Sequence, residues 1–268
     1  MSKIKKAIHE IHEMDSLSER NQWVNQLHPL VKFILTVGYI AVVVSFPKYD
    51  VAGVMGMMVY PVAVFLLADL SFCKSLERLR IVLPLVCFIG VFNPFFDKNY
   101  FVINNVRISA GVLSMITLIL KGIFSVLASY LLIATTSVEK ICYALRCLHV
   151  PKAIVTQIML MYWYITVLLE EVERITQAYM LRAPGQRGIH YKAWGTLVGQ
   201  LLLKSVDRAN AVYESMMLRG FCGEYQYMGE KVTYQWKDIC YLLVWCVVFL
   251  VFRRYPVVLL AGSLFGGA

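Results

Sequence analysis

The sequence lacks the short motifs that mark most nucleotide-using and hydrolytic enzymes. It contains no GxxxxGK[ST] stretch, so it has no P-loop backbone to cradle nucleotide phosphates. HExxH, GxSxG and the glycine-rich turn of dinucleotide-binding folds are also absent. We therefore expect no catalytic residues and no cofactor in this chain.

Charged residues are also scarce. They make up 16% of the 268 residues, and hydrophobic residues make up 59%, against roughly 25% and 45–50% in soluble domains. Several apolar runs approach the roughly 20 residues needed to cross a bilayer. Lys and Arg cluster beside these runs, as the positive-inside rule expects, so the net charge of +9 does not indicate nucleic-acid binding. The composition predicts an all-α, polytopic membrane protein.

The seven cysteines do not form a disulfide framework. Their number is odd and no CxxC pair occurs, which is typical of apolar residues in a reducing compartment. The first 29 residues are polar and mixed in charge. We therefore expect no amino-terminal secretory signal, and the first apolar segment itself must direct insertion.

The apolar runs predict five or six transmembrane helices. Residues 1–29 form a cytoplasmic segment and residues 30–136 hold the first four helices, at 30–46, 51–72, 81–96 and 111–136. Pro61 interrupts the second helix, a basic connector at 74–80 lies inside the cell, and 97–107 is an external loop. The last region, 238–268, contains a helix at 238–252, and the tail 256–268 is either a sixth span or an interfacial piece.

Among the charged residues in the predicted spans, Lys121 and Asp69 need an interpretation. Lys121 lies near the middle of the fourth span, where a lysine costs on the order of 2.5–3.5 kcal/mol. It is either a helix-packing or gating contact, or a cation paired with a buried carbonyl or carboxylate. Asp69, the carboxylate within the second span, is interpreted as a span-end or packing residue.

Residues 137–237 have a different character, because charged residues are interleaved with apolar ones. We predict a cytoplasmic region with helices at 138–148, 151–182 and 196–219. Pro151 suits a first helical turn, and Pro184-Gly185 suits a stop. We predict that neither of the two long helices, 151–182 and 196–219, is apolar enough to cross a membrane.

His9 and His12 are the one close pair among five histidines. Spaced i, i+3 on a helix, they could share a metal ion with Glu13. The alternative, which we favour, is a solvated amphipathic helix without a metal site.

The two long polar helices end in the same pattern. Met180-Leu181-Arg182-Ala183 closes the first, and Met217-Leu218-Arg219-Gly220 closes the second. One arginine in a last helical turn only offsets the helix dipole, by roughly 0.3–1 kcal/mol. Two copies beside a small residue favour insertion of both helix ends into grooves of a soluble partner, where the guanidinium binds carboxylates or carbonyls bidentately. The predicted site comprises Leu181, Arg182, Ala183, Leu218, Arg219 and Gly220.

The stretch 207–221, DRANAVYESMMLRGF, resembles the signature of the transmembrane T component of energy-coupling factor (ECF) transporters, and of CbiQ-type cobalt and nickel permeases in particular. The likeness extends over nearly the whole chain, through HPLVK at 28–32, AGV at 110–112, ATTS at 134–137 and EEVER at 170–174. The departures are Lys121, the Tyr162-Trp163-Tyr164 run, and Leu-Arg-Ala-Pro where many members have Ala-Arg-Gly.

The resemblance implies a non-catalytic subunit of the bacterial or archaeal cell membrane. Two ATPase subunits would receive Arg182 and Arg219, and a separate membrane-embedded S component would bind the cargo. Cobalt or nickel is the cargo by subfamily likeness, and a vitamin is the alternative. A stand-alone secondary transporter and a membrane enzyme are the rival classes: the first requires polar helices in two corresponding halves, and the second requires several membrane-facing carboxylates.

Overall fold

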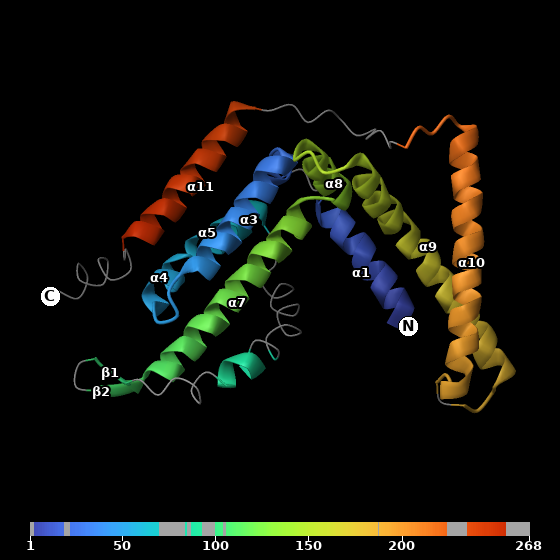
Figure 1. The fold of residues 1–268 in the computed structure, drawn as a ribbon, viewed down its shortest axis with the longest axis horizontal. Coiled ribbons are helices and arrows are strands. Elements are labelled where there is room, and N and C mark those ends of the chain that lie inside the picture. The colour runs from blue at the N-terminus through green and yellow to red at the C-terminus, as the bar shows by residue number, and fades with distance from the viewer. Residues whose placement is uncertain are drawn as a thin grey trace. The chain divides into compact units, whose positions relative to one another are not determined.

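The computed structural model describes residues 3–18, 22–69, 84, 87–92, 100–103, 106–186, 188–223 and 235–255. In this part of the chain nearly all regular structure is helical, which confirms the all-α class (Figure 1). The helices are α1 (Lys3–Ser18), α2 (Trp23–Gln26), α3 (Pro29–Ser45), α4 (Val51–Gly56), α5 (Val59–Ala68), α7 (Ala110–Thr135), α8 (Val138–Cys147), α9 (Lys152–Arg182), α10 (Tyr191–Leu218) and α11 (Trp236–Arg254). One short antiparallel hairpin, β1 (Tyr100–Ile103) and β2 (Val106–Ser109), precedes α7.

The chain divides into two compact units. The arm unit consists of Met1–Ser16 and Val138–Glu230, and the core unit consists of Leu17–Ser137 and Lys231–Ala268. The structure thus joins most of α1 to the arm unit, a division of the amino-terminal segment that the sequence did not predict. The assignment of the predicted segments to membrane and cytoplasm stays a prediction.

The core unit packs its helices around buried aromatic side chains. Tyr39 and Val43 of α3 are fully buried. The ring of Tyr39 lies 4.6 Å from that of Tyr60 and 5.5 Å from that of Phe249, centroid to centroid. These contacts join α3, α5 and α11, so one aromatic cluster holds together segments far apart in the sequence.

The predicted interruption of the second span by Pro61 is confirmed, and the helix breaks about one turn before the proline. Pro61 lies in the first turn of α5 and has no N–H to bond the carbonyl of Met57, four residues before it. The helix breaks between α4 and α5 at Met57 and Met58. The hydroxyl of Tyr39 donates to the freed Met57 carbonyl at 2.9 Å, which satisfies an acceptor that the bilayer could not.

The other predicted spans are matched where the structure describes them. Helices α3 and α7 lie within one residue of the predicted 30–46 and 111–136, and α11 extends the predicted 238–252 by two residues at each end. Of the predicted span 81–96, residues 84 and 87–92 are described, and they are helical. The rest of that span, the connector 74–80 and the tail 256–268 lie outside the described residues. The predicted loop 97–107 includes β1 and the start of β2.

Lys121 is half-buried and pairs with backbone carbonyls. Its Nζ donates to the carbonyls of Val44 at 3.0 Å and Phe46 at 2.5 Å, at the end of α3 where helix carbonyls lack intrahelical partners. The carbonyl-pairing interpretation is therefore confirmed. Asp69 is the left-handed residue that ends α5, at φ 44°, in keeping with a span-end role.

One prediction about the long helices is wrong. Three stretches of described helix are long and apolar enough to cross a membrane, namely Val51–Ala68, Ala110–Thr135 and Lys152–Arg182, and the third is α9. Through Leu169 its one charged residue is Lys152, whereas Glu170, Glu171 and Glu173 follow. The prediction failed because the charged residues of the second half were weighed against an apolar first half that is long enough to cross a membrane. No such stretch is found in α10.

The arm unit is built on α9. Cys142 of α8 packs against Val155 and Met159 of α9 in a small core of their own. Helix α1 also contacts α9: the hydroxyl of Tyr162 donates to Asp15 at 2.6 Å, and Lys5 lies 3.7 Å from Glu173. Nothing in the sequence predicted this pairing, because its partners are more than a hundred residues apart.

Candidate functional site

The first predicted helix end, at Arg182, is followed by a loop that one tyrosine side chain restrains. Arg182 is the last residue of α9, and Ala183 leaves the helix at φ −125°. The hydroxyl of Tyr179, one turn earlier, donates to Oε1 of Gln186 at 2.9 Å and accepts from the backbone N–H of His190 at 3.3 Å. These contacts restrain the loop at its middle and at its end, and they therefore fix the direction in which the chain leaves α9.

The second helix end, at Arg219, is closed by its own backbone. Gly220 is left-handed at φ +79°. Its N–H donates to the carbonyl of Met217 at 3.0 Å, and the N–H of Phe221 donates to that of Met216 at 3.0 Å. This pair of bonds is a Schellman motif, in which a glycine after the helix satisfies the last free carbonyls. Phe221 and Met216 both line one groove of the arm unit.

Both motifs present their leucine and arginine to the surroundings. Leu181 is 82% exposed and Leu218 is 90% exposed. Arg182 and Arg219 are exposed as well, and among the described residues none forms an ion pair with either guanidinium. An exposed leucine beside an arginine is a combination that a protein partner can cover, since it offers apolar area and a planar ionic fork together.

The structure does not bring the two motifs together. Helix α10 begins after the loop at Arg182 and runs back along α9, so Arg219 lies at its far end (Figure 1). The 28 residues of α10 correspond to about 42 Å at 1.5 Å per residue. The motifs can therefore reach two separate grooves, and one small pocket could not hold both.

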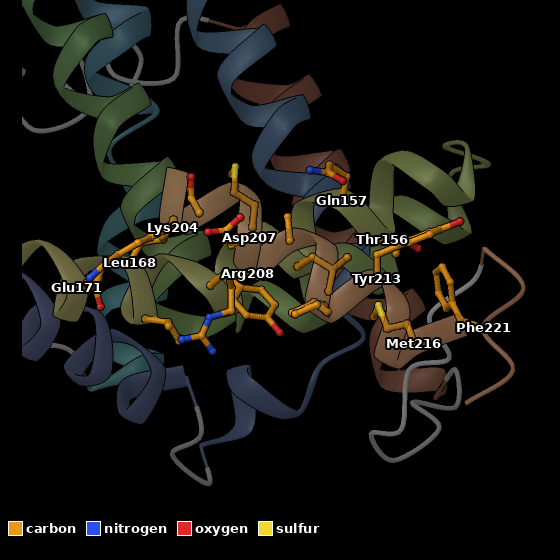
Figure 2. Close-up of a pocket in the computed structure, with 18 of the residues that line it drawn as sticks. Thr156, Gln157, Leu168, Glu171, Lys204, Asp207, Arg208, Tyr213, Met216 and Phe221 are labelled. Atoms are coloured by element: carbon orange, nitrogen blue, oxygen red, sulfur yellow. The ribbon is translucent and has the colours of Figure 1, made fainter. Parts of the chain in front are cut away.

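A groove runs between α9 and α10 within the arm unit (Figure 2). It has a volume of about 960 Å³ and is lined mainly by apolar side chains, including Leu160, Leu168, Tyr213 and Met216. Helix α10 has no buried residue along its length. Leu202 and Leu203 near its middle are both exposed. Such apolar exposure on a long helix marks a surface made for contact with protein or lipid.

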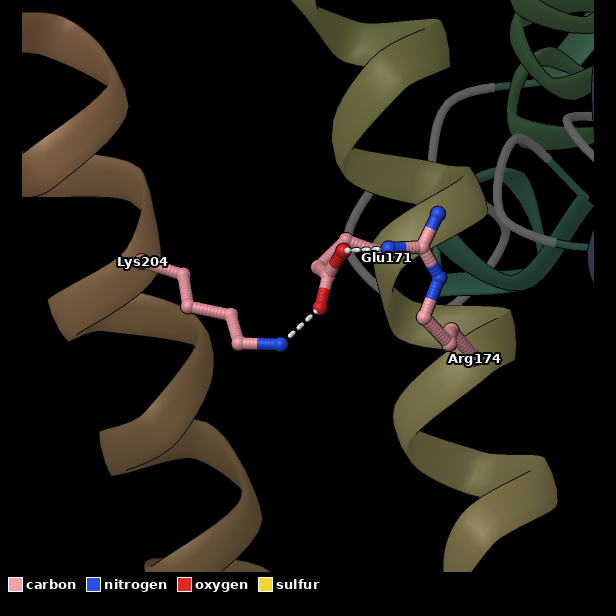
Figure 3. Close-up of polar contacts among 3 residues, drawn as sticks. All are labelled: Glu171, Arg174 and Lys204. Carbon is pink, nitrogen blue, oxygen red and sulfur yellow. Dashed lines mark hydrogen bonds and ion pairs between the residues drawn. The ribbon is translucent and has the colours of Figure 1, made fainter. Parts of the chain in front are cut away.

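One ionic cluster connects the two helices across this groove. Lys204 of α10 donates to Glu171 of α9, and Arg174 lies 3.4 Å from the other oxygen of the same carboxylate (Figure 3). The Glu171 side chain is only 16% exposed. Only Lys204 links the two helices, because Arg174 and Glu171 both belong to α9, where Arg174 holds the carboxylate in place for this contact.

The other candidates from the sequence gain little support. No cluster of three or more His, Cys, Asp or Glu side chains suited to a metal ion is found in the part of the chain that the structure describes. His9 and His12 are exposed on α1, and Nδ1 of His12 lies 2.9 Å from the carbonyl of Ile8 in the same helix. The geometry fits the solvated amphipathic helix.

Sequence reasoning missed Tyr179 and the Glu171–Lys204 pair. A tyrosine directly before a motif, three residues before its arginine, has no special pattern, so only the folded loop reveals its role. The charge pair joins two helices, and its members stand 33 residues apart. The family-like EEVER run did contain Glu171, but it did not indicate which partner this carboxylate binds.

These features define a multi-pass membrane protein with long helices that present two exposed arginine ends. A comparison with family models places residues 20–228 in the CbiQ family, described as cobalt transport protein. The chain belongs to this family. It is therefore a membrane component of a transport system.

Two curated relatives extend the comparison. An uncharacterized protein of Methanocaldococcus jannaschii is 28% identical over 188 residues, which cover 66% of this chain and 64% of that protein. The nickel permease LarQ of Lactiplantibacillus plantarum is 28% identical over 118 residues, which cover 44% of this chain and 43% of the permease. The chain thus spans less than two thirds of the length of either relative.

Proposed function

We propose that the chain is the transmembrane coupling subunit of an ECF-type importer. The observation that carries the proposal is the pair of exposed Leu-Arg helix ends at Arg182 and Arg219, placed at opposite ends of α10 without a described partner in the chain. Family membership supports a transport role. On this proposal the chain catalyses nothing, and ATP is hydrolysed by two partner ATPase subunits.

Each ATPase subunit receives one helix end. The leucine fills an apolar groove, and the guanidinium binds carboxylates or backbone carbonyls at its rim with two parallel hydrogen bonds. When ATP draws the two ATPases together, the distance between their grooves changes. The arm unit then has different contact free energies in the two states, as any coupling mechanism requires.

The two long helices act as levers. Helix α9 has 31 residues, or about 46 Å at 1.5 Å per residue, and the Glu171–Lys204 contact joins it to α10. A displacement at either tip is then passed along a pair of helices and is not absorbed by one helix bending alone. The arm unit lies on the cytoplasmic side, with the apolar first half of α9 along the membrane.

A substrate-binding S component is the membrane partner, and its cargo is cobalt or nickel. The similarity to the nickel permease LarQ supports this cargo, with a vitamin as the alternative. The exposed apolar residues of α10 offer a surface for such a membrane-embedded partner.

Co-purification from the native membrane tests the proposal. We expect the tagged chain to retain two ATPase subunits, and Arg182→Ala with Arg219→Ala to lose both without loss of the membrane fold. Arg174→Ala is the matched control, because this exposed arginine contacts its own chain through Glu171. Full ATPase recovery by the double variant, or cargo transport by the isolated chain, would refute the coupling role.

A further inference from the structure

The chain passes between its two units three times, after Ser16, after Ser137 and after Glu230. The two units are therefore linked covalently at these three passages. Three buried polar side chains of the core unit bind backbone beside the first two passages and at the first described residue after the third, namely those of Asn25, Lys32 and Asp238. We call these three residues the passage node.

Asn25 holds the first passage. It lies in α2 and is buried. Its Nδ2 donates to the carbonyl of Leu17 at 3.1 Å, and it lies 3.4 Å from the carbonyl of Ser18. These are the last carbonyls of α1 and have no acceptor role within that helix, so Asn25 fastens the end of α1 where the chain enters the core unit.

Lys32 holds the second passage. Its Nζ donates to the carbonyl of Thr135, the last residue of α7, at 2.9 Å. It also donates to the backbone carbonyl of Asn25 at 3.2 Å. One ammonium group on α3 therefore ties the exit of α7 to α2, which already holds the first passage.

Asp238 binds the first part of the chain that the structure describes after the third passage. Its Oδ2 accepts from the N–H of Gln235 at 2.9 Å as part of a capping box at the start of α11. Its Oδ1 accepts from the N–H of His28 at 2.9 Å, 210 positions earlier in the sequence. Gln235 is the first described residue after the third passage, so this carboxylate anchors the returning chain to the start of α3.

The node holds charge where charge is costly. Lys32 is 5% exposed and Asp238 is 3% exposed. Removing such ions from water is unfavourable unless hydrogen bonds compensate, and both groups bind backbone partners. Burial lowers the pKa of His28, against the opposing influence of Asp238, which favours the neutral imidazole beside them. A purely structural junction could be apolar at lower cost.

We propose that the passage node positions the three passages as one unit, so that displacement of the arm unit reaches the core unit undiminished. This inference rests on the proposed coupling function. Asn25, Lys32 and Asp238 are positioning residues and touch neither cargo nor nucleotide. Without the node each passage would move independently of the others. The amount of cargo transported per ATP hydrolysed would then fall.

The chain offers a matched control. Lys32 and Lys121 both sit in helices of the core unit, and each donates to two backbone carbonyls. The carbonyls bound by Lys121 belong to Val44 and Phe46, far in sequence from every passage. Lys32→Met and Lys121→Met therefore remove the same kind of interaction, and only the first removes it at a passage.

The test uses the complete complex of chain, ATPase subunits and S component in liposomes, with radiolabelled Co²⁺ and Ni²⁺ as probes. We expect Lys32→Met to keep both ATPases and to raise the ATP hydrolysed per ion by about tenfold, the equivalent of one charged hydrogen bond. Lys121→Met should leave that ratio within about twofold, and Lys32→Arg should restore much of the coupling. An unchanged ratio in Lys32→Met, or equal changes in both methionine variants, overturns the inference.

A second measurement separates this inference from the proposed function. If wild-type chain recovers no ATPase, the coupling proposal fails, but the node can still be tested by hydrogen exchange on the chain alone. Asp238→Asn should speed exchange at the amides of His28 and Gln235, and with them at the segment ending in Thr135, by about tenfold. Faster exchange confined to Gln235 would show that the passages are held independently and would overturn the node.

Discussion

The two arginine helix ends carry nearly the same residues but close their helices in different ways. At Arg219 the backbone itself ends the helix, because Gly220 adopts a left-handed conformation and two N–H groups donate to carbonyls of the last helical turn. At Arg182 the chain leaves through Ala183 and Pro184, and the side chain of Tyr179 restrains the loop. The residues proposed to contact a partner are the same in both ends, whereas the way in which each helix presents them differs.

This difference separates what the motifs have in common from what is local to each. Both leave the leucine and arginine exposed, so a partner that reads only those two side chains can accept either end. The small residue that follows serves two purposes. At position 220 a glycine is required by the backbone, and at position 183 the φ of −125° is ordinary for alanine.

Single arginine substitutions should give the largest effect and test whether the ends are equivalent. Arg182→Ala and Arg219→Ala should each weaken one ATPase contact by about 2 kcal/mol, as loss of an interface arginine commonly does. Mass measurement of the purified complex should show one ATPase subunit fewer in each variant. If either variant alone loses both subunits, the two ends do not act as independent contacts.

Exchanging the small residues should give a smaller and asymmetric effect. Gly220→Ala forces a Cβ into the left-handed region at a cost of about 1 kcal/mol, with no neighbouring atom within 4 Å of that Cβ to complicate the result. Hydrogen exchange at Phe221 should accelerate, and binding through Arg219 should weaken. Ala183→Gly at the matching position should change binding by a few tenths of a kcal/mol at most.

Removing one hydroxyl at the other end should give the smallest effect. Tyr179→Phe deletes both contacts that restrain the loop after Arg182, worth about 0.5 kcal/mol together because the site is exposed. The amide of His190 should exchange faster while that of Phe221 stays unchanged. Tyr213→Phe, on the exposed face of α10, is the control, and a similar acceleration there would mean that the loop is not held by Tyr179.

Long apolar runs with clear ends were predictable from the sequence. Helices α3, α7 and α9 begin and end within one or two residues of expectation, because proline, glycine and polar residues mark their limits. Helix α10 begins five residues before the predicted 196, where the side chain of His190 accepts from the N–H of Lys192. Histidine is not a common cap, so the sequence carried no usable signal for this start.

Contacts between distant segments were not predictable. The Asp15–Tyr162 bond joins residues 147 apart, and the His28–Asp238 bond joins residues 210 apart. No local pattern encodes such pairs. The exposure of the Leu-Arg motifs followed from their polar context, whereas their placement at opposite ends of α10 depends on how the loop at 183–190 turns. The identity of the site residues as ATPase contacts stays a prediction.

Site-specific photo-crosslinking from the two motif leucines tests the central claim most directly. A photoreactive residue placed at position 181 or 218, both highly exposed, should capture an ATP-binding subunit in intact membranes, and a pair of probes in one chain should capture two. The same probe at Tyr191, which is 90% exposed at the start of α10, should capture neither. Crosslinks from 181 and 218 that go only to lipid or to the chain itself would contradict the account.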